Sequence, residues 1–413
     1  MKAVILSIGD ELALGQTVDT NAAYLSAQLA QLGITIAYHL TVPDVRHDVH
    51  RAFAEAADRA DLIIATGGLG PTDDDLTRDG LADALNTTLA LDADALAEID
   101  RFFAERDRTM IERNKVQAMC PVGADLIPNN RGTAPGIHAM LKGAEIWVMP
   151  GVPREMVGMF DDHIKPTLVG EVAHVILTRK INTFGMGESD LAHELGDLAA
   201  RDRNPLVGTT VAQGVVSVRI RSEFPTQAQA QQELDATTQQ LESLLGDLVF
   251  GRETDTLADA VAAQLTSLNQ SVATAESCTG GLVAKQLTDI DGASNYFRAG
   301  WVTYANESKT HQLDVPAELI TQHGAVSEQV AQSMARHAQQ KSNADYALAL
   351  TGIAGPTGAT TDKPVGLVFI ALAQRDLDTA VSRHVFPGDR AVVRQRAANT
   401  ALNLLRLRTR RPA

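Results

Sequence analysis

The segment DLIIATGGLGPTDDDLTRD, residues 61–79, decides the fold class of the N-terminal part of the chain. Residues 62–65 are a short apolar run of β type, and a glycine-rich turn follows them at once. Four acids then lead into a segment of helical character: Asp73, Asp74, Asp75 and Asp79. A buried strand that ends in such a turn before a helix is typical of α/β folds, in which ligands bind at the carboxyl ends of parallel strands.

The same alternation extends outward from this segment. Apolar runs at residues 4–8, 34–38 and 146–149 predict further strands, the last one ending in PGVPREM. Between them lie a helix that Thr20 can cap and Gly33 ends, and a second helix over about residues 46–60. The pattern predicts an N-terminal domain over residues 1–170 with a parallel sheet covered on both faces.

Two further domains are expected. Residues 171–252 change character: HVILTRKINTFG and VVSVRIRS predict strands, and a Gln-rich helix with Leu241, Leu244 and Leu245 on one face predicts a small α+β module. Residues 253–413 return to strand and helix, with ESCTGG directly after a strand at residues 271–275 and a final helix over about residues 391–407. The length of 413 residues suits two or three domains.

Composition narrows the function classes. The 51 acids outnumber the 36 bases, which gives a formal charge of -15 and argues against nucleic-acid binding. The basic tail with Arg406, Arg408, Arg410 and Arg411 is interpreted as a solvated end. Two cysteines far apart fit a reducing cytosol, and no apolar run is long enough for a bilayer. The start, MKAVILSIGDE, is not that of a signal peptide, so a cytoplasmic location is expected.

Ser277 in AESCTGG is the candidate nucleophile of the C-terminal domain, because a strand-to-helix turn presents it at the sheet edge. The N–H groups of the Gly280–Gly281 turn are candidate oxyanion donors, and a desolvated Lys309 is the candidate base, with Tyr304 as a relay. Spacing alone leaves two alternatives open. Ser277 can be a helix cap beside a surface Lys309 and a packed Tyr304, or Cys278 can be the nucleophile. His311, His323 and His337 are interpreted as surface residues.

A second glycine-rich loop, TGIAGPTG, follows another strand at residues 351–358. Free N–H groups and hydroxyls on such a loop suit a phosphate or a carboxamide, and Arg390 can add a bidentate phosphate contact. The predicted substrate-binding residues of this domain are Thr279, Gly280, Gly281, Thr351, Gly352, Gly355, Thr357, Gly358 and Arg390.

Acidic loops follow the first three strands of the N-terminal domain. Asp10 and Glu11 come after the first, Asp44 after the second and Asp75 after the third, beside Gly67, Gly68 and Gly70. Carboxylates next to an anion site repel the ligand unless a hard cation lies between them, so Mg²⁺ is the expected bridge. Asp10, Asp44 and Asp75 are the candidate metal ligands, and helix capping by these acids is the alternative.

The motifs of the C-terminal domain closely resemble the C-terminal domain of the CinA family. They are AESCTGG, GWVTYANESK, GAVSEQVA, ALTGIAGPTG and KPVGLVF, in this order. That domain is similar to nicotinamide mononucleotide deamidases of the PncC type. The resemblance implies hydrolysis of the carboxamide to the acid and ammonia, with Ser277 as nucleophile, Tyr304 and Lys309 as activating partners, and no metal.

The N-terminal domain resembles the molybdopterin-binding fold of the MoaB/MogA type, through GDELALGQTVDTN, TGGLGPTDDDLT, RGTAPG and PGVPREM. Some members of the CinA family look like metal-dependent ADP-ribose pyrophosphatases. The resemblance places that site at Asp10, Glu11, Asp44, Gly67, Gly68, Gly70, Thr72, Asp75 and Thr77. It also implies a KH-like middle module and a homodimer. A non-catalytic scaffold for competence or DNA damage and a pterin-binding protein are the alternatives.

Overall fold

The computed structural model describes residues 1–168, 175–212 and 214–410. They form two compact units. One holds the described residues of Met1–Thr178 together with Ser222–Glu233, and the other holds Arg179–Arg221 and the chain from Leu234 onward. The domain boundary expected at residues 170 and 171 lies outside the described residues, and the three-domain division stays a prediction. No helix among the described residues is long and apolar enough to cross a membrane.

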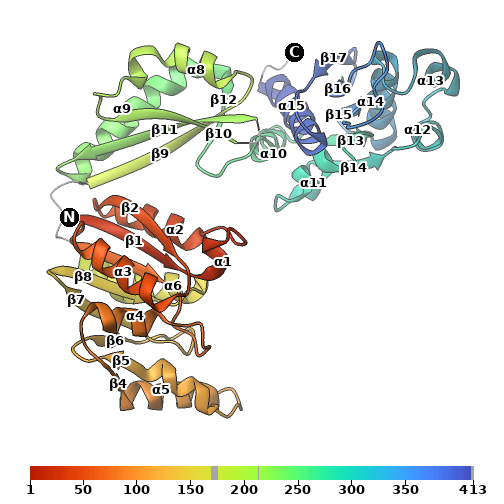
Figure 1. The fold of residues 1–413 in the computed structure, drawn as a ribbon. Helices are drawn as coiled ribbons and strands as arrows, with labels where there is room; N and C mark the ends of the chain where they lie inside the picture. Colours follow the sequence, from red (N-terminus) through yellow and green to blue (C-terminus); the bar gives the residue numbers. More distant parts are fainter. Residues whose placement is uncertain (169–174, 213, 411–413) are drawn as a thin grey trace. The chain divides into compact units, whose positions relative to one another are not determined.

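The N-terminal domain is built on a mixed sheet (Figure 1). Its strands in spatial order are β2 (Thr35–Val42), β1 (Lys2–Ile8), β3 (Leu62–Thr66), β8 (Ala144–Met149), β7 (Gly136–Leu141) and β6 (Asp125–Ile127). Strands β2, β1, β3 and β8 pair in parallel, as predicted. Strand β7 pairs antiparallel with β8, because a tight turn at Lys142 and Gly143 connects the two strands directly. Strand β6 in turn pairs antiparallel with β7. The predicted parallel sheet is thus confirmed for β2, β1, β3 and β8, and the antiparallel edge was not predicted.

Two apolar layers sandwich this sheet. Val4 and Leu6 of β1 point into one layer, and Ala3 and Ile5 point into the other, because successive side chains of a strand face opposite sides. The helices of the domain are α1 (Asp10–Ala13), α2 (Thr20–Gln31), α3 (Arg46–Ala57), α4 (Thr77–Ala84), α5 (Ala93–Ala104), α6 (Pro153–Met159) and α7 (Lys165–Leu168). Helix α2 is capped by the side chain of Asp19, which accepts from Ala22 N, and not by Thr20.

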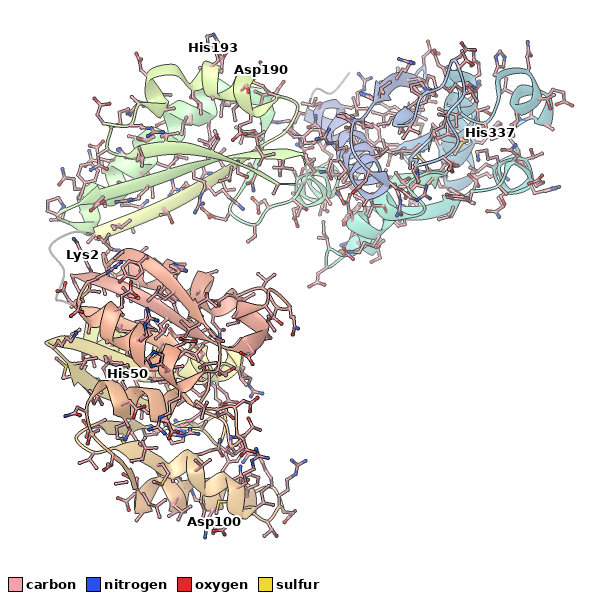
Figure 2. The ribbon with its side chains drawn as sticks, viewed as in Figure 1. Lys2, His50, Asp100, Asp190, His193 and His337 are labelled. Carbon is pink, nitrogen blue, oxygen red and sulfur yellow. The ribbon has the colours of Figure 1, made fainter. Side chains whose placement is uncertain are left out.

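The small strands β4 (Leu89–Leu91) and β5 (Met119–Pro121) form a separate antiparallel pair beside α5. The middle segment carries a second sheet in the order β10 (Leu206–Ala212), β11 (Val215–Phe224), β9 (Val175–Thr183) and β12 (Val249–Arg252). Its helices are α8 (Glu188–Leu195) and the Gln-rich α9 (Gln227–Leu245). Helix α8 ends at Leu195, because Gly196 has a φ of +47° and turns the chain away. Figure 2 shows Asp190 and His193 on the outer side of α8.

The C-terminal domain has a five-stranded sheet in the order β14 (Phe297–Val302), β13 (Val272–Glu276), β15 (Tyr346–Gly352), β16 (Leu367–Gln374) and β17 (Ala380–Val385). β13 pairs in parallel with both neighbours, whereas β16 and β17 run antiparallel. Its helices are α10 (Leu257–Ser267), α11 (Leu282–Thr288), α12 (Asn306–Leu313), α13 (Ala317–His323), α14 (Glu328–Ser342) and α15 (Arg390–Arg410).

The two faces of this sheet are also apolar. Leu348 and Leu350 of β15 pack into a core with α10, α11 and α15, and Ala347 and Ala349 pack into a core with α14. Arg406 of α15 is not solvated as predicted, because it is buried and donates to the main-chain oxygens of Asp247 and Val249. Burial lowers the pKa of this guanidinium to about 10. Arg408 donates to Gln374 Oε1 at 2.6 Å, Arg410 is exposed, and Arg411 lies outside the described residues.

Candidate active site

Ser277 follows the last residue of β13, near the middle of the C-terminal sheet. Its N–H donates to Leu350 O at 2.9 Å, so the pairing with β15 continues one residue beyond β13. Gly280 N–H donates to Ser277 O at 3.1 Å and closes a turn. Gly280 and Gly281 have φ values of +61° and +90°, which glycine adopts without a Cβ penalty. The glycine pair lets the chain turn into α11, which begins at Leu282.

This turn retains main-chain donors. Because Gly280 N–H is bound to Ser277 O, it is not available to an oxyanion, which corrects the prediction for this group. Among the described residues, the N–H groups of Thr279 and Gly281 have no hydrogen-bond acceptor. Unpaired donors at a strand-to-helix turn are suited to a developing negative charge.

Lys309 lies on α12, and the fold brings it to Ser277 across 32 residues of sequence. Its side chain is only 1% exposed, and its Nζ atom lies 3.2 Å from Ser277 Oγ. The same nitrogen donates to Thr303 O at 2.9 Å and to Tyr304 O at 3.4 Å. Lys309 is therefore not a surface cation, which removes one of the alternatives that the sequence left open.

The three neighbours of Lys309 Nζ are oxygen atoms, and Nζ donates to each of them: Ser277 Oγ, Thr303 O and Tyr304 O. An ammonium has three donors, whereas a neutral amine has two N–H donors and one lone pair. On loss of one proton, the two remaining donors can stay with the carbonyl oxygens, and the lone pair can then accept from the Ser277 hydroxyl. Burial lowers the pKa of Lys309, while the Cys278 thiol and the Glu307 carboxylate oppose this shift. The arrangement favours a lysine that accepts a proton from the serine.

Cys278 is the weaker candidate nucleophile. Its side chain is 6% exposed and belongs to the apolar core formed with α11 and α15. Burial raises the pKa of the thiol to about 11, so it is protonated at neutral pH. A thiol attacks as the thiolate, and a buried protonated cysteine acts as a small apolar residue.

The main chain and the side chain of Tyr304 make different contacts. Its main-chain oxygen accepts from Lys309, but its ring is 58% exposed and its hydroxyl accepts from Arg390 Nη2 at 2.7 Å. Arg390 Nη1 also donates to Gly355 O at 3.0 Å. The structure thus joins Tyr304, Arg390 and the second glycine-rich loop, while the phenol itself does not contact Ser277 or Lys309.

The second glycine-rich loop is buried at its start and exposed to solvent at its far end. Thr351 is buried and its hydroxyl donates to Ala325 O at 2.7 Å, so it supports the loop in this conformation. Gly352 is half-buried, and Gly355 is buried with a φ of +81°. Thr357 and Gly358 are exposed at the far end. Thr279 is buried, and its main-chain oxygen accepts from Arg394 at 2.6 Å.

Sequence reasoning missed two residues that support this site, Glu276 and Arg394. Both oxygens of the buried Glu276 side chain accept main-chain N–H groups of α11, and Arg394 reaches the nucleophile turn from α15. An acid as the last residue of an otherwise apolar strand was the available signal for Glu276. The histidines lie elsewhere: Figure 2 shows His337 on α14, where Nδ1 lies 3.2 Å from Ser333 Oγ.

A cavity of about 490 Å³ lies at the carboxyl ends of the N-terminal strands. Five of the predicted residues line it: Glu11, Gly67, Gly68, Gly70 and Asp75. Asn21, Gln117 and Glu155 also line it and were not predicted. Burial raises the pKa of Glu155, and Asn129 Nδ2 donates to this carboxyl group at 2.7 Å and opposes the rise.

Hydrogen bonds among its own residues stabilise the glycine-rich loop of this cavity. Asp75 Oδ1 accepts from Gly70 N at 2.8 Å, and its Oδ2 accepts from the N–H and hydroxyl of Thr72. Thr77 Oγ1 donates to Gly67 O at 2.9 Å. Thr72, Asp75 and Thr77 therefore shape the loop, and the buried Arg78 joins them through the main-chain oxygens of Leu69 and Gly70.

Asp10 and Asp44 form a pair at the ends of β1 and β2. Asp10 N donates to Asp44 Oδ2 at 2.9 Å, and Asp44 N donates to Asp10 Oδ1 at 3.1 Å. Burial raises the pKa of Asp44, as do the charges of Asp10, Glu11 and Asp74, while the N–H of Asp10 lowers it. The chain thus concentrates negative charge here, which a divalent cation would neutralise.

The three candidate metal ligands do not act as one group. Among the described residues, no group of three or more His, Cys, Asp or Glu side chains is arranged to hold a metal ion. Asp75 does not fit as a ligand in this conformation, because its own loop occupies both oxygens. The Asp10–Asp44 pair fits a divalent cation by its chemistry, as two adjacent carboxylates with excess negative charge.

The C-terminal domain is thus an α/β domain with a buried serine–lysine pair just beyond the end of β13. The family model described as the CinA C-terminal domain matches residues 254–409. A probable molybdopterin binding domain matches residues 4–169, and the damage-inducible protein CinA KH domain matches residues 178–251.

Relatives that match nearly the whole chain show which family it belongs to. The putative competence-damage inducible protein of Symbiobacterium thermophilum is 42% identical over 98% of both chains. The CinA-like protein of Geobacter sulfurreducens is 40% identical over 99% of both chains. The crystal structure of competence/damage inducible protein CihA from Agrobacterium tumefaciens is 43% identical, covers 36% of this chain and 91% of its own, and has a TM-score of 0.36. The chain belongs to the CinA family of competence-damage inducible proteins.

Proposed function

We propose that the C-terminal domain hydrolyses the carboxamide of nicotinamide mononucleotide to nicotinate mononucleotide and ammonia. The observation that carries the proposal is the buried contact between Lys309 Nζ and Ser277 Oγ at 3.2 Å. A serine needs a neighbouring base to become a nucleophile, and a buried lysine with a lowered pKa is such a base.

In the acylation step the neutral Lys309 amine takes the hydroxyl proton while Ser277 Oγ bonds to the carboxamide carbon. The negative charge then forms on the former carbonyl oxygen, and the unpaired N–H groups of Thr279 and Gly281 are the donors offered by the turn. The Lys309 ammonium returns its proton to the leaving nitrogen. Ammonia departs, and the nicotinoyl group remains as an ester on Ser277.

In the deacylation step a water molecule replaces the ammonia. Lys309 takes a proton from the water, whose oxygen bonds to the ester carbon, and the ammonium then returns the proton to Ser277 Oγ. The carboxylic acid leaves and the free serine is restored. No metal is proposed for this route.

The phosphate of the nucleotide is assigned to the Arg390 side of the site. Arg390 is already oriented by Tyr304 Oη and Gly355 O, beside a glycine-rich loop with an exposed end. A guanidinium held in one orientation binds a phosphate with little further loss of side-chain freedom. The exposed Tyr304 ring offers a flat apolar surface beside it.

The test is release of ammonia from nicotinamide mononucleotide by the purified full-length protein. Wild type and Ser333→Ala, a serine on α14 bonded to His337, are expected to release ammonia at the same rate. Ser277→Ala is expected to release none above the uncatalysed background. Full activity in Ser277→Ala, or no activity in the wild type, would remove the proposal.

We propose a second activity for the N-terminal domain, the divalent-cation-dependent hydrolysis of ADP-ribose. The supporting observation is the cavity of about 490 Å³ lined by glycine main chain, which suits a nucleotide with a pyrophosphate. The Asp10–Asp44 pair does not line this cavity, but it adjoins the lining residues Gly9 and Glu11; it would hold the cation, which would neutralise charge on the phosphates. The glycine-rich loop would orient the phosphates through its main chain.

The second test compares ADP-ribose turnover with and without a chelator, in wild type and in Asp44→Asn. Turnover that is lost with chelator and in Asp44→Asn supports the proposal. Pterin that copurifies with the protein, without turnover, would support the pterin-binding alternative. Absence of both activities, together with nucleic-acid or protein binding at physiological salt, would support the scaffold alternative.

We further propose a cytoplasmic homodimer. Membership of the CinA family motivates this proposal, and sedimentation of the full-length protein at micromolar concentration tests the dimer. A single monomeric species over that range would contradict it.

A further inference from the structure

Glu276 is a charged residue in the interior of the C-terminal domain. It is the last residue of β13 and its exposed fraction is 0%. One side-chain oxygen accepts from Val283 N at 3.1 Å and the other from Ala284 N at 2.8 Å. These two N–H groups belong to the first turn of α11, where no main-chain acceptor exists for them. The carboxylate therefore connects the strand before Ser277 to the helix after it.

The main chain of Glu276 connects the same strand to the base. Thr303 N donates to Glu276 O at 2.9 Å, and Thr303 O in turn accepts from Lys309 Nζ at 2.9 Å. A displacement of Glu276 thus moves the turn that carries Ser277 and the carbonyl that orients Lys309. The geometry links both reacting side chains to one buried residue that contacts neither of them.

We propose that Glu276 is a positioning residue of the serine–lysine site, which holds Ser277 and the carbonyl oxygen of Thr303 in register for proton transfer. The proposal rests on the proposed amide hydrolysis, and it adds a residue to which no role was assigned. Its buried carboxylate is used by two main-chain donors, so it orients the turn and does not exchange protons with the substrate.

The experiment compares Glu276→Gln with Glu307→Gln in the full-length protein. Each substitution removes one carboxylate, but Glu307 is exposed and its side chain has no main-chain anchor in α11. Glutamine at position 276 presents an NH2 group to one of two N–H donors, so the turn must shift. A fluorophosphonate, which bonds to an activated serine oxygen with loss of fluoride, counts the reactive sites. The kcat for ammonia release is then expressed per labelled site.

Glu276→Gln is expected to lower kcat per labelled site at least tenfold, with KM within about twofold of wild type. The rise of ammonia release with pH, the acid limb of its pH profile, is expected to keep its midpoint. Glu307→Gln is expected to leave kcat unchanged and to move the acid limb to lower pH, because it removes a charge that raises the pKa of Lys309. Partial unfolding alone would lower the number of labelled sites and leave kcat per site unchanged. That result, or wild-type kinetics in Glu276→Gln, would overturn the proposal.

Two further measurements distinguish a failure of the positioning role from misfolding of the variant and from a wrong substrate assignment. If Glu276→Gln does not fold, Glu276→Asp keeps the charge but is shorter by one methylene, and the same loss of kcat per site is expected. If the wild type does not hydrolyse nicotinamide mononucleotide, the labelling rate of Ser277 replaces kcat. A labelling rate that falls at least tenfold in Glu276→Gln then supports the positioning role while the substrate assignment fails, and an unchanged rate overturns the role.

Discussion

Lys309 Nζ lies 3.2 Å from Ser277 Oγ in a part of the C-terminal domain where the lysine is almost fully buried. The two residues come from α12 and from the turn after β13, so only the folded chain brings them together. Two main-chain carbonyl oxygens accept from the same nitrogen, and once this amine is neutral its lone pair can accept from the serine hydroxyl. This distance lies within the range expected between a nucleophile and its base.

Substitution of the two adjacent candidate nucleophiles should give opposite results. Ser277→Ala should lower kcat for ammonia release by more than about 10³-fold, because the group that forms the acyl ester is lost. Cys278→Ala should keep kcat within a small factor of wild type and should lower stability by about 1 kcal/mol, the effect of a small buried cavity. Steady-state kinetics and thermal unfolding measure both. Loss of activity in Cys278→Ala with the fold intact would restore the cysteine as the nucleophile.

Replacement of Lys309 should remove the base and preserve the site. Lys309→Met fills a similar volume in the buried position and should lower kcat by about 10²- to 10⁴-fold, the usual contribution of a general base. Lys309→Arg should also be inactive, because arginine stays protonated and has no lone pair to offer. A calorimetric scan should show that the methionine variant is folded. Retention of more than a tenth of the activity by Lys309→Met would mean that another group takes the serine proton.

The pH profile should report the titration of Lys309. The neutral amine is the active form, so kcat/KM should rise with pH and level off above the pKa of the free enzyme. Because burial lowers this pKa, the midpoint should lie below the ordinary lysine value of about 10.4. The measurement is kcat/KM for ammonia release across the range in which the protein is folded. Activity that falls as pH rises through this range would contradict a lysine base.

Arg390 should contribute to binding of the substrate through its phosphate group. Arg390→Ala should raise KM for nicotinamide mononucleotide at least tenfold, because a charge-assisted contact of about 1.5–3 kcal/mol is lost. The same variant should change kcat/KM for nicotinamide riboside, which has no phosphate, by much less. Tyr304→Phe removes the hydroxyl that orients Arg390 and should give a smaller effect in the same direction. Equal losses for both substrates would place the phosphate elsewhere.

Asp75 should matter for stability of the N-terminal loop more than for cation binding. Asp75→Asn replaces an acceptor oxygen by a donor in front of main-chain N–H groups, which should cost about 1–3 kcal/mol. Asp10→Asn leaves this loop untouched and should weaken the effect of Mg²⁺ on the melting temperature. Thermal unfolding of both variants with and without Mg²⁺ separates the two roles. A Mg²⁺ effect that is lost in Asp75→Asn and kept in Asp10→Asn would reverse the assignment.

Local sequence patterns predicted most of the scaffold of both sites. Alternating apolar runs and glycine-rich turns placed β1, β3, β8 and β13 within a residue or two of their observed bounds, because burial on both faces and left-handed backbone leave a local signal. The position of Ser277 at a strand-to-helix junction followed from the same signal. The antiparallel edge of the N-terminal sheet did not, since strand direction depends on how the chain returns through space.

Local patterns do not determine burial or the direction of a side chain between elements. The sequence by itself therefore determined the α/β architecture, the family and the serine at the end of β13, all of which depend on residues close together in the chain. Only the tertiary structure decided that Lys309 is buried beside that serine, that the Tyr304 hydroxyl contacts Arg390, and that Glu276 holds α11. These contacts depend on which elements pack together, and packing sets both the desolvation of a charge and the partners left for it.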